Sequence, residues 1–187
     1  MRWAITAGLA AILAVAGCSA EEGAHPPAPF ALTEDAIGRY CGMNVLEHPG
    51  PKGQIILGQV PEPIWFSSAR DAVAFTMMPD EPKTIAAIYV SDMGSAASWD
   101  APGAENWVDA KAAFFVIDST RRGGMGTMET VPFSSETAAR SFVDANGGKV
   151  VRFADIPPEY VLGSAGDDTT GSVEAGSSTD SGVQVGE

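Results

Sequence analysis

Sulfur side chains dominate the chemistry that this sequence can offer. The chain has two cysteines and seven methionines in 187 residues. One cysteine stands in the triplet Cys41-Gly42-Met43, where a thiolate and a thioether two residues apart can turn toward one centre. Both are soft ligands that favour Cu(I) over calcium, magnesium or manganese. Three interpretations of Cys41 compete: a small core residue, a nucleophile or a metal ligand.

The nucleophile interpretation needs a neighbouring base. The chain has two histidines, His25 in a proline-rich N-terminal segment and His48 in the turn His48-Pro49-Gly50-Pro51. A Cys41–His48 dyad is conceivable, but this proline-rich turn is poorly suited to position a base. The simplest interpretation of His48 is a solvated loop residue, with metal ligation as the weaker alternative. The sequence has no phosphate-binding loop, HExxH helix or CxxC pair, so we expect no enzymatic activity.

A glycine-rich segment supplies further thioethers. Met125 and Met128 alternate with glycines over residues 123–129. Such a loop offers little for a methionine to pack against, and it lets a thioether move onto a metal. Loop packing is the alternative for both residues. Met93 follows a strand-like run and is a weaker candidate ligand, for which packing is the favoured interpretation.

A duplicated pattern positions these residues. Phe66-Ser67-Ser68 and Phe133-Ser134-Ser135 lie 67 residues apart, and each is followed at equal offsets by an alanine and a phenylalanine. Serine is a favoured helix N-cap because its hydroxyl can accept a free backbone N–H. Helices are therefore expected over 69–78 and 136–145, with Phe75 and Phe142 on their buried faces. The first ends before Pro79 and the second before a glycine pair.

Strand-like apolar runs flank both expected helices. They cover residues 54–57, 64–66 and 84–90 in the first half, and 112–117, 131–133 and 149–153 in the second. Each half therefore has the order β-β-α-β, and the fold class is α+β. Two halves of this size have little core each, so we expect the two repeated β-β-α-β units to pack into one compact body. Trp99 and Trp107, near the connection, are expected to pack at the interface.

The ends of the chain have a different composition. Residues 1–17 have the character of a secretory signal peptide, and Val15-Ala16-Gly17-Cys18 resembles a bacterial lipobox. That resemblance implies cleavage before Cys18 and its lipidation, and Ser19 after it implies sorting to the outer membrane. Residues 18–29 are expected to form a tether. The folded region is 30–163, with repeats at about 40–95 and 107–160, and 164–187 is expected to be a disordered acidic tail.

Charge and cysteine count exclude two classes of protein. The chain has 11 basic against 24 acidic residues, a formal net charge of −13. A nucleic-acid-binding protein needs a basic surface, so nucleic acid is not an expected partner. Two cysteines cannot form a multi-bridge disulfide scaffold. If one carries lipid, Cys41 is the only free thiol left.

The order of these motifs resembles the NosL family, the accessory lipoproteins of nitrous oxide reductase. The residues that carry the resemblance are Tyr40-Cys41-Gly42-Met43, Gly50-Pro51-Lys52-Gly53-Gln54-Ile55, Trp65-Phe66-Ser67-Ser68-Ala69-Arg70-Asp71, Phe75-Thr76-Met77, Ile88-Tyr89-Val90-Ser91-Asp92-Met93-Gly94, Trp107-Val108-Asp109-Ala110, Gly123-Gly124-Met125-Gly126 and Val131-Pro132-Phe133. The resemblance implies a pair of β-β-α-β units. It also implies a periplasmic, membrane-anchored Cu(I) chaperone for the copper–sulfide centre of nitrous oxide reductase. The implied partners are that reductase and its ABC-type assembly complex.

A copper carrier needs few ligands, because it must hand its metal over by exchanging them one at a time. Our hypothesis is that Cys41 and Met43 form the core pair and that Met125 or Met128 completes the site. The alternative function is a metal-free, lipid-anchored scaffold protein. It would use Trp65, Trp99 and the glycine-rich loop as its partner surface.

Overall fold

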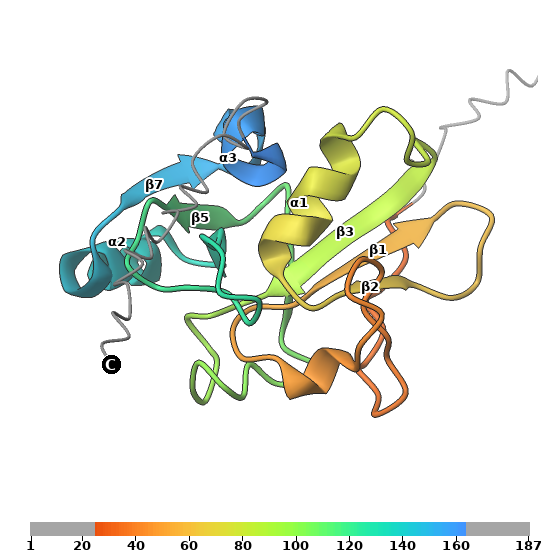
Figure 1. Cartoon of the computed structure of the whole chain (residues 1–187), viewed down its shortest axis with the longest axis horizontal. Coiled ribbons are helices and arrows are strands. Elements are labelled where there is room, and N and C mark those ends of the chain that lie inside the picture. Colours follow the sequence, from red (N-terminus) through yellow and green to blue (C-terminus); the bar gives the residue numbers. More distant parts are fainter. Residues whose placement is uncertain (1–24, 164–187) are drawn as a thin grey trace, which may run out of the picture.

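The structure is a computed structural model that describes residues 25–163 (Figure 1). The expected signal peptide, Cys18, most of the tether and the acidic tail from residue 164 lie outside the described residues. Within residues 25–163, no helix combines the length and apolar character needed to cross a membrane.

The first half is a four-stranded antiparallel sheet with a helix on one face (Figure 1). Its elements are the 3-10 turn η1 (Val45–Glu47), β1 (Gly53–Leu57), β2 (Ile64–Phe66), α1 (Ala69–Met77), β3 (Ile85–Ser91) and β4 (Trp107–Asp109). The strands lie in the order β2-β1-β3-β4. Strand β4, in the segment that the sequence analysis assigned to the connection, pairs with β3 through Trp107 and Ser91.

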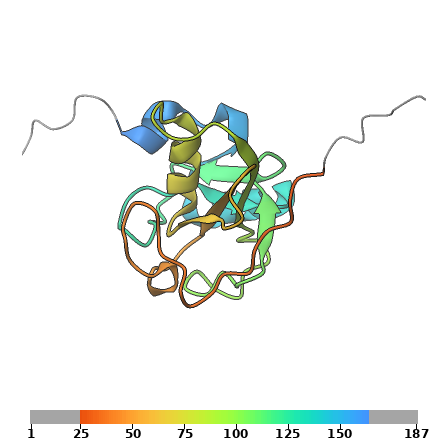
Figure 2. The same cartoon turned by 90° about the vertical axis from the view of Figure 1, so that its right-hand side faces the viewer.

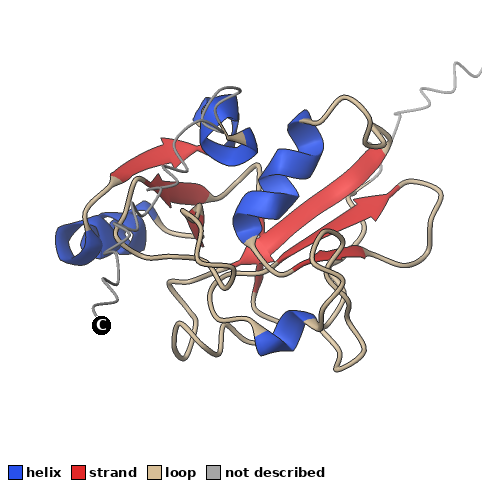
Figure 3. Ribbon diagram, viewed as in Figure 1, coloured by secondary structure: helices blue, strands red, loops and turns tan. Residues whose placement is uncertain are grey.

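The second half repeats this arrangement with a smaller sheet. Its elements are β5 (Phe114–Ile117), β6 (Val131–Phe133), α2 (Glu136–Asn146), β7 (Lys149–Arg152), the 3-10 turn η2 (Phe153–Asp155) and α3 (Pro158–Leu162). The antiparallel order β6-β5-β7 corresponds to β2-β1-β3. Figure 3 shows the two sheets side by side along the longest axis. The predicted β-β-α-β order is confirmed in both halves.

A shared core joins the halves into one body. Phe75 of α1 is fully buried and packs on Phe66, with ring centroids 5.5 Å apart. The same cluster contains Phe115 of β5 and Val161 of α3, which belong to the second half. Phe142 is half-buried and packs on Phe133 at 5.3 Å. Burial of these apolar side chains supplies the main driving force for the association of the two units.

The tryptophans pack in two different places. Trp99, in the connection, stacks on Phe142 of α2 at 6.4 Å and carries the Arg121 guanidinium over its ring. Its predicted role at the interface is therefore confirmed. Trp107 instead packs on Trp65 of the same half, at 5.9 Å. These two side chains cover a small cluster formed with the N-terminal segment, which Figure 2 shows in red across one side of the body.

The helix caps differ from the prediction. Ser68 and Ser135 do occupy the N-cap positions, but neither side chain makes a cap hydrogen bond. Ser68 Oγ instead donates to the carboxylate of Glu129, which also accepts the backbone N–H of Arg70 in the first turn of α1. A carboxylate is a stronger acceptor than a hydroxyl and is stabilised at a helix N-terminus. The acceptor for α1 therefore comes from the other half of the molecule.

Candidate metal site

The Cys41 loop precedes η1 and lies against the end of β2. The loop is closed by the Gly38 N–H, which donates to the Met43 carbonyl at 2.9 Å, and it is joined to β2 by the Arg39 N–H, which donates to the Trp65 carbonyl at 2.8 Å. Cys41 is a free, half-buried thiol. Met43, two residues on, has 39% of its surface exposed. The loop therefore presents one sulfur partly and the other openly to solvent.

Cys41 contacts a serine rather than a histidine. Its Sγ lies 3.3 Å from Ser67 Oγ, just before α1. A side chain at Gly38 would obstruct this contact, because a Cβ there would lie 2.6 Å from both atoms. The imidazole of His48 is not hydrogen-bonded to Cys41 in the described residues, so the dyad has no geometric support.

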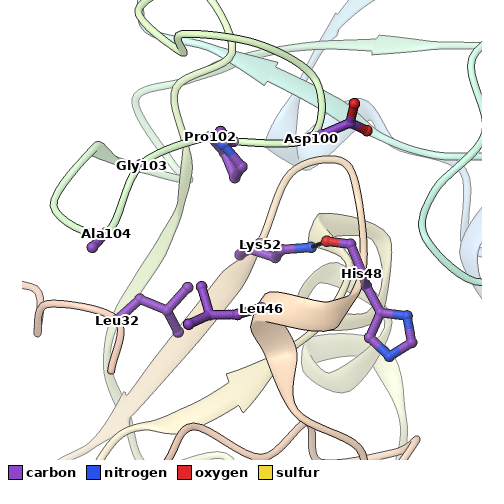
Figure 4. Close-up of a pocket in the computed structure, with 9 residues that line it drawn as sticks. Leu32, Leu46, His48, Lys52, Asp100, Pro102, Gly103 and Ala104 are labelled. Carbon is purple, nitrogen blue, oxygen red and sulfur yellow. Dashed lines mark hydrogen bonds between the residues drawn. The ribbon is translucent and has the colours of Figure 1, made fainter. Parts of the chain in front are cut away.

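Lys52 is the buried link between the Cys41 side and the His48 turn. Only 1% of its surface is exposed. Its Nζ donates to the backbone carbonyls of His48, Pro49 and Ser67, and Figure 4 shows the bond to His48. Burial lowers the Lys52 pKa to about 8, against the attraction of Glu129 and Cys41. The Lys52 ammonium group neighbours the Cys41 thiol and bonds three backbone carbonyls beside it, which favours an ordered site.

His48 is half-buried, which corrects the expectation of a solvated loop residue. Its Nε2 is buried and has no hydrogen-bond partner in the described part of the chain. A cavity of about 220 Å³ lies beside the Lys52–His48 bond, lined in part by Leu32, Leu46 and Pro102. The imidazole points away from this cavity in Figure 4. A buried polar atom without a partner needs an explanation, and imidazole nitrogen is a common copper ligand.

The glycine-rich loop of the second half packs directly on the His48 turn. Gly124 makes this contact possible: a Cβ there would lie 2.5 Å from His48 Cβ and 2.9 Å from the Pro49 carbonyl oxygen. Met125, the next residue, has 46% of its surface exposed, and Met128 is half-buried. Neither is a core residue, so packing alone does not account for them.

Glu129 fixes the end of that loop. It is buried, with 1% of its surface exposed. Oε1 accepts the backbone N–H groups of Arg70 at 2.8 Å and Thr130 at 2.9 Å. The Ser68 hydroxyl donates to both carboxylate oxygens, at 2.9 Å to Oε2 and 3.1 Å to Oε1. Burial raises the Glu129 pKa to about 7, although these hydrogen bonds oppose the shift. The carboxylate therefore ties the residue after Met128 to the start of α1.

The contacts form one continuous path through the predicted ligand segments. It runs from Cys41 to Ser67, through Lys52 to His48, and on to Gly124 beside Met125. In residues 25–163, no three His, Cys, Asp or Glu side chains gather at a point where they could hold a metal ion. The ligand set predicted from the sequence, a cysteine with methionines, is of a different kind.

Met93 is placed elsewhere. Its N–H donates to the Pro132 carbonyl at 2.9 Å, and its side chain packs with Trp99 and Phe142 in the second core cluster. This position agrees with packing, the interpretation that the sequence favoured. Met77 and Met78 likewise pack on the first core cluster.

Sequence reasoning missed the burial of Lys52 and Glu129, the two charged residues of the described chain that lie buried beside the predicted ligand segments. Each precedes a short apolar strand, and a charged residue in that position usually faces solvent. Their only signal was proximity in the chain to the His48 turn and to Met128.

Known proteins are similar to this chain over nearly its whole described length. The NosL family model matches residues 29–161. A copper-binding lipoprotein NosL from Achromobacter cycloclastes is 49% identical over 155 residues, which cover 82% of this chain and 80% of that protein. One of the same description from Stutzerimonas stutzeri is 30% identical over 151 residues, 79% of this chain and 77% of the relative.

A solved structure is similar as well. The crystal structure of the copper chaperone NosL from Shewanella denitrificans matches with a TM-score of 0.65 at 32% sequence identity. The match covers 70% of this chain and 97% of that one. The architecture described above is therefore an architecture found by experiment in a relative.

Proposed function

Because this chain belongs to the NosL family, we propose that it is a membrane-anchored periplasmic Cu(I) chaperone. It delivers copper for assembly of the copper–sulfide catalytic centre of nitrous oxide reductase. Support comes from relatives described as a copper-binding lipoprotein and a copper chaperone. The observation that supports the proposal is the path of contacts from Cys41 to the methionine loop, because it connects the segments that carry soft donors in the two halves.

The proposed ligands are the Cys41 thiolate and the Met43 thioether, with Met125 or Met128 as the third. The structure adds His48 as a stronger candidate than the sequence did, because its Nε2 is buried without a partner. Met43 and Met125 are 39% and 46% exposed. An acceptor protein can therefore reach these thioethers and replace them one at a time while Cys41 still holds the metal.

The proposed partners are nitrous oxide reductase and its ABC-type assembly complex, reached from a membrane surface. The relatives are described as lipoproteins, which supports lipidation at Cys18 and a location in the cell envelope. We propose the periplasmic side, with the outer membrane as the site of attachment. We propose that the protein acts as a carrier and not as an enzyme; relatives described as a copper-binding lipoprotein and a copper chaperone support the role of carrier.

The metal-free scaffold has less support in the structure. Its proposed surface was Trp65, Trp99 and the glycine-rich loop. Trp65 packs on Trp107, and Trp99 stacks on Phe142 beneath Arg121. Both tryptophans are therefore largely occupied by contacts within the described chain.

Anaerobic titration with Cu(I) against a competing chelator tests the binding. Wild type is expected to take one Cu(I) per chain, and Cys41→Ser is expected to lose competitive binding because the thiolate is removed. Met93→Leu is the matched control, since Met93 packs in the other core cluster. Undiminished affinity in Cys41→Ser would refute the role of Cys41. Failure of the wild type to compete would favour the scaffold.

Delivery requires a separate measurement. A strain that lacks this chain is expected to make nitrous oxide reductase deficient in the copper of its catalytic centre. The copper content of the purified reductase is the readout. Wild type should restore it and Cys41→Ser should not. Full copper content in the absence of the chain would contradict the proposed delivery.

A further inference from the structure

Two carboxylates accept hydrogen bonds from the opposite half of the molecule, and each such connection is called a tie. Glu129 of the second half accepts hydrogen bonds from Ser68 and Arg70 at the start of α1. Asp92 of the first half accepts from the N–H of Ser134 at 3.0 Å and from its Oγ at 2.6 Å. Both carboxylates belong to buried residues, with 1% and 5% of their surfaces exposed. The two ties are therefore alike in burial and in the kind of donor.

Only the Glu129 tie lies beside the proposed copper ligands. Glu129 follows Met128 directly, and its Oε2 would lie 2.5 Å from a Cβ at Gly123, so the loop folds closely over the carboxylate. The same loop contacts the His48 turn through Gly124. Asp92 instead holds the segment before α2, in the region of the second core cluster. Loss of the Glu129 tie therefore loosens the methionine loop at one end, where the Tyr160 hydroxyl still donates to the Glu129 carbonyl at 2.9 Å. Loss of the Asp92 tie leaves this loop in place.

We propose that Glu129 is a positioning residue for copper binding: by accepting the hydrogen bonds of Ser68 and Arg70, it holds the Met125–Met128 loop of the second half against the His48 turn of the first. The inference rests on the proposed function, because the loop matters only if it supplies a copper ligand. Glu129 itself does not bind the metal. Its contribution is to keep a thioether within reach of the metal on Cys41.

The hydrogen-bond pattern allows positioning of the loop by Glu129 to be distinguished from an effect of its negative charge. Oε1 accepts both backbone N–H groups, and Oε2 is bonded to the Ser68 hydroxyl alone in the described residues. A glutamine can reproduce the pattern, because its oxygen can accept the two N–H groups while its NH₂ donates to Ser68 Oγ. Glu129→Gln therefore keeps the tie without a negative charge, and Glu129→Ala removes it.

The test combines Cu(I) affinity with the number of sulfur ligands. The variants are Glu129→Gln, Glu129→Ala and, as the matched control, Asp92→Ala. Each is loaded anaerobically with Cu(I), titrated against a chelator and examined by copper X-ray absorption. Glu129→Ala is expected to bind about 10–100-fold more weakly, the usual effect of removing a group that supports a metal ligand. It should lose one sulfur ligand while the Cys41 thiolate remains. Glu129→Gln and Asp92→Ala should match wild type.

Two results would overturn the inference. One is a folded Glu129→Ala variant with the affinity and sulfur count of wild type. The other is a Glu129→Gln variant as weak as Glu129→Ala, which would assign the effect to charge. If Glu129→Ala does not fold, Ser68→Ala decides: it removes one donor to the carboxylate, and unchanged affinity and sulfur count there would also overturn the inference. If wild type itself binds no Cu(I), the proposed function has failed. If wild type binds Cu(I) and the Glu129→Ala variant behaves like it, only the role of Glu129 has failed.

Discussion

Replacement of Glu129 by glutamine should stabilise the metal-free protein, and only above acidic pH. Glu129 is buried, and that burial raises its pKa from 4.5 to about 7. In the unfolded chain the carboxyl group ionises near its ordinary value. The folded protein therefore holds a proton through a pH range in which the unfolded chain has lost it, and the folded state loses stability as the pH rises through that range.

The sign and size follow from this difference. Below about pH 4.5 both states are protonated and Glu129 costs nothing. Between that value and about pH 7 the unfolded chain is favoured increasingly, by 1.36 kcal/mol for each unit of pKa difference. The total is about 3 kcal/mol, a large part of the 5–15 kcal/mol that is typical of a folded domain. Glutamine has no such titration. The free energy of unfolding of the Glu129→Gln variant, relative to wild type, should therefore rise by up to about 3 kcal/mol over this range.

Urea unfolding of the metal-free proteins, followed by circular dichroism, measures this difference. Groups that titrate equally in both proteins cancel. The comparison should end near pH 7.5, because Lys52, with a pKa lowered by burial to about 8, begins to lose its proton above it. A difference in unfolding free energy that is constant from about pH 4 to about pH 7.5 would refute the reasoning. It would mean that the carboxyl group ionises as easily in the folded protein as in the unfolded chain.

Three further predictions concern neighbouring residues. Gly124→Ala places a Cβ 2.5 Å from His48 Cβ, so the methionine loop must shift; Cu(I) affinity should fall, at a cost of about 1–3 kcal/mol in unfolding free energy, and unchanged affinity would argue against a ligand from this loop. His48→Ala should weaken Cu(I) binding at least about tenfold, or about 1.4 kcal/mol, if the buried Nε2 is a ligand; chelator competition with no change would exclude it. Asp92→Ala should lower the unfolding free energy by about 2–3 kcal/mol because Ser134, Gly94 and Ser95 lose their acceptor; urea unfolding at neutral pH identical to wild type would contradict the importance of this tie.

The order of elements was predictable because local signals were strong. Pro79 and Gly147 follow the ends of the two helices closely, and Phe75 lies on the buried face that its spacing predicted. Strand β4, Trp107–Asp109, was missed because three residues are too short to show a period and no repeated motif marks it. Strands β2 and β6 are equally short, but each leads into a copy of the repeated Phe-Ser-Ser motif. Pairing with β3 defines this strand, and such long-range pairing leaves little trace in a local window.

The candidate donors could be proposed from the sequence, whereas the buried residues that support them could not. Cys41, Met43 and the methionine loop stand out because soft side chains next to glycines serve packing poorly. Lys52 and Glu129 do not stand out, because a charged residue is normally exposed. Only the tertiary structure shows their partners. Lys52 donates to three backbone carbonyls. Glu129 accepts four hydrogen bonds, from two backbone N–H groups and one hydroxyl.

The measurement that tests the account most directly is copper X-ray absorption on the anaerobically loaded wild type and on Cys41→Ser. We predict Cu(I) with a thiolate and at least one thioether sulfur in the wild type, and loss of the thiolate component in the variant. Met93→Leu should reproduce the wild-type spectrum, because Met93 packs with Trp99 away from Cys41. A wild-type spectrum without sulfur ligands, or one unchanged by Cys41→Ser, would contradict a copper site built on this cysteine.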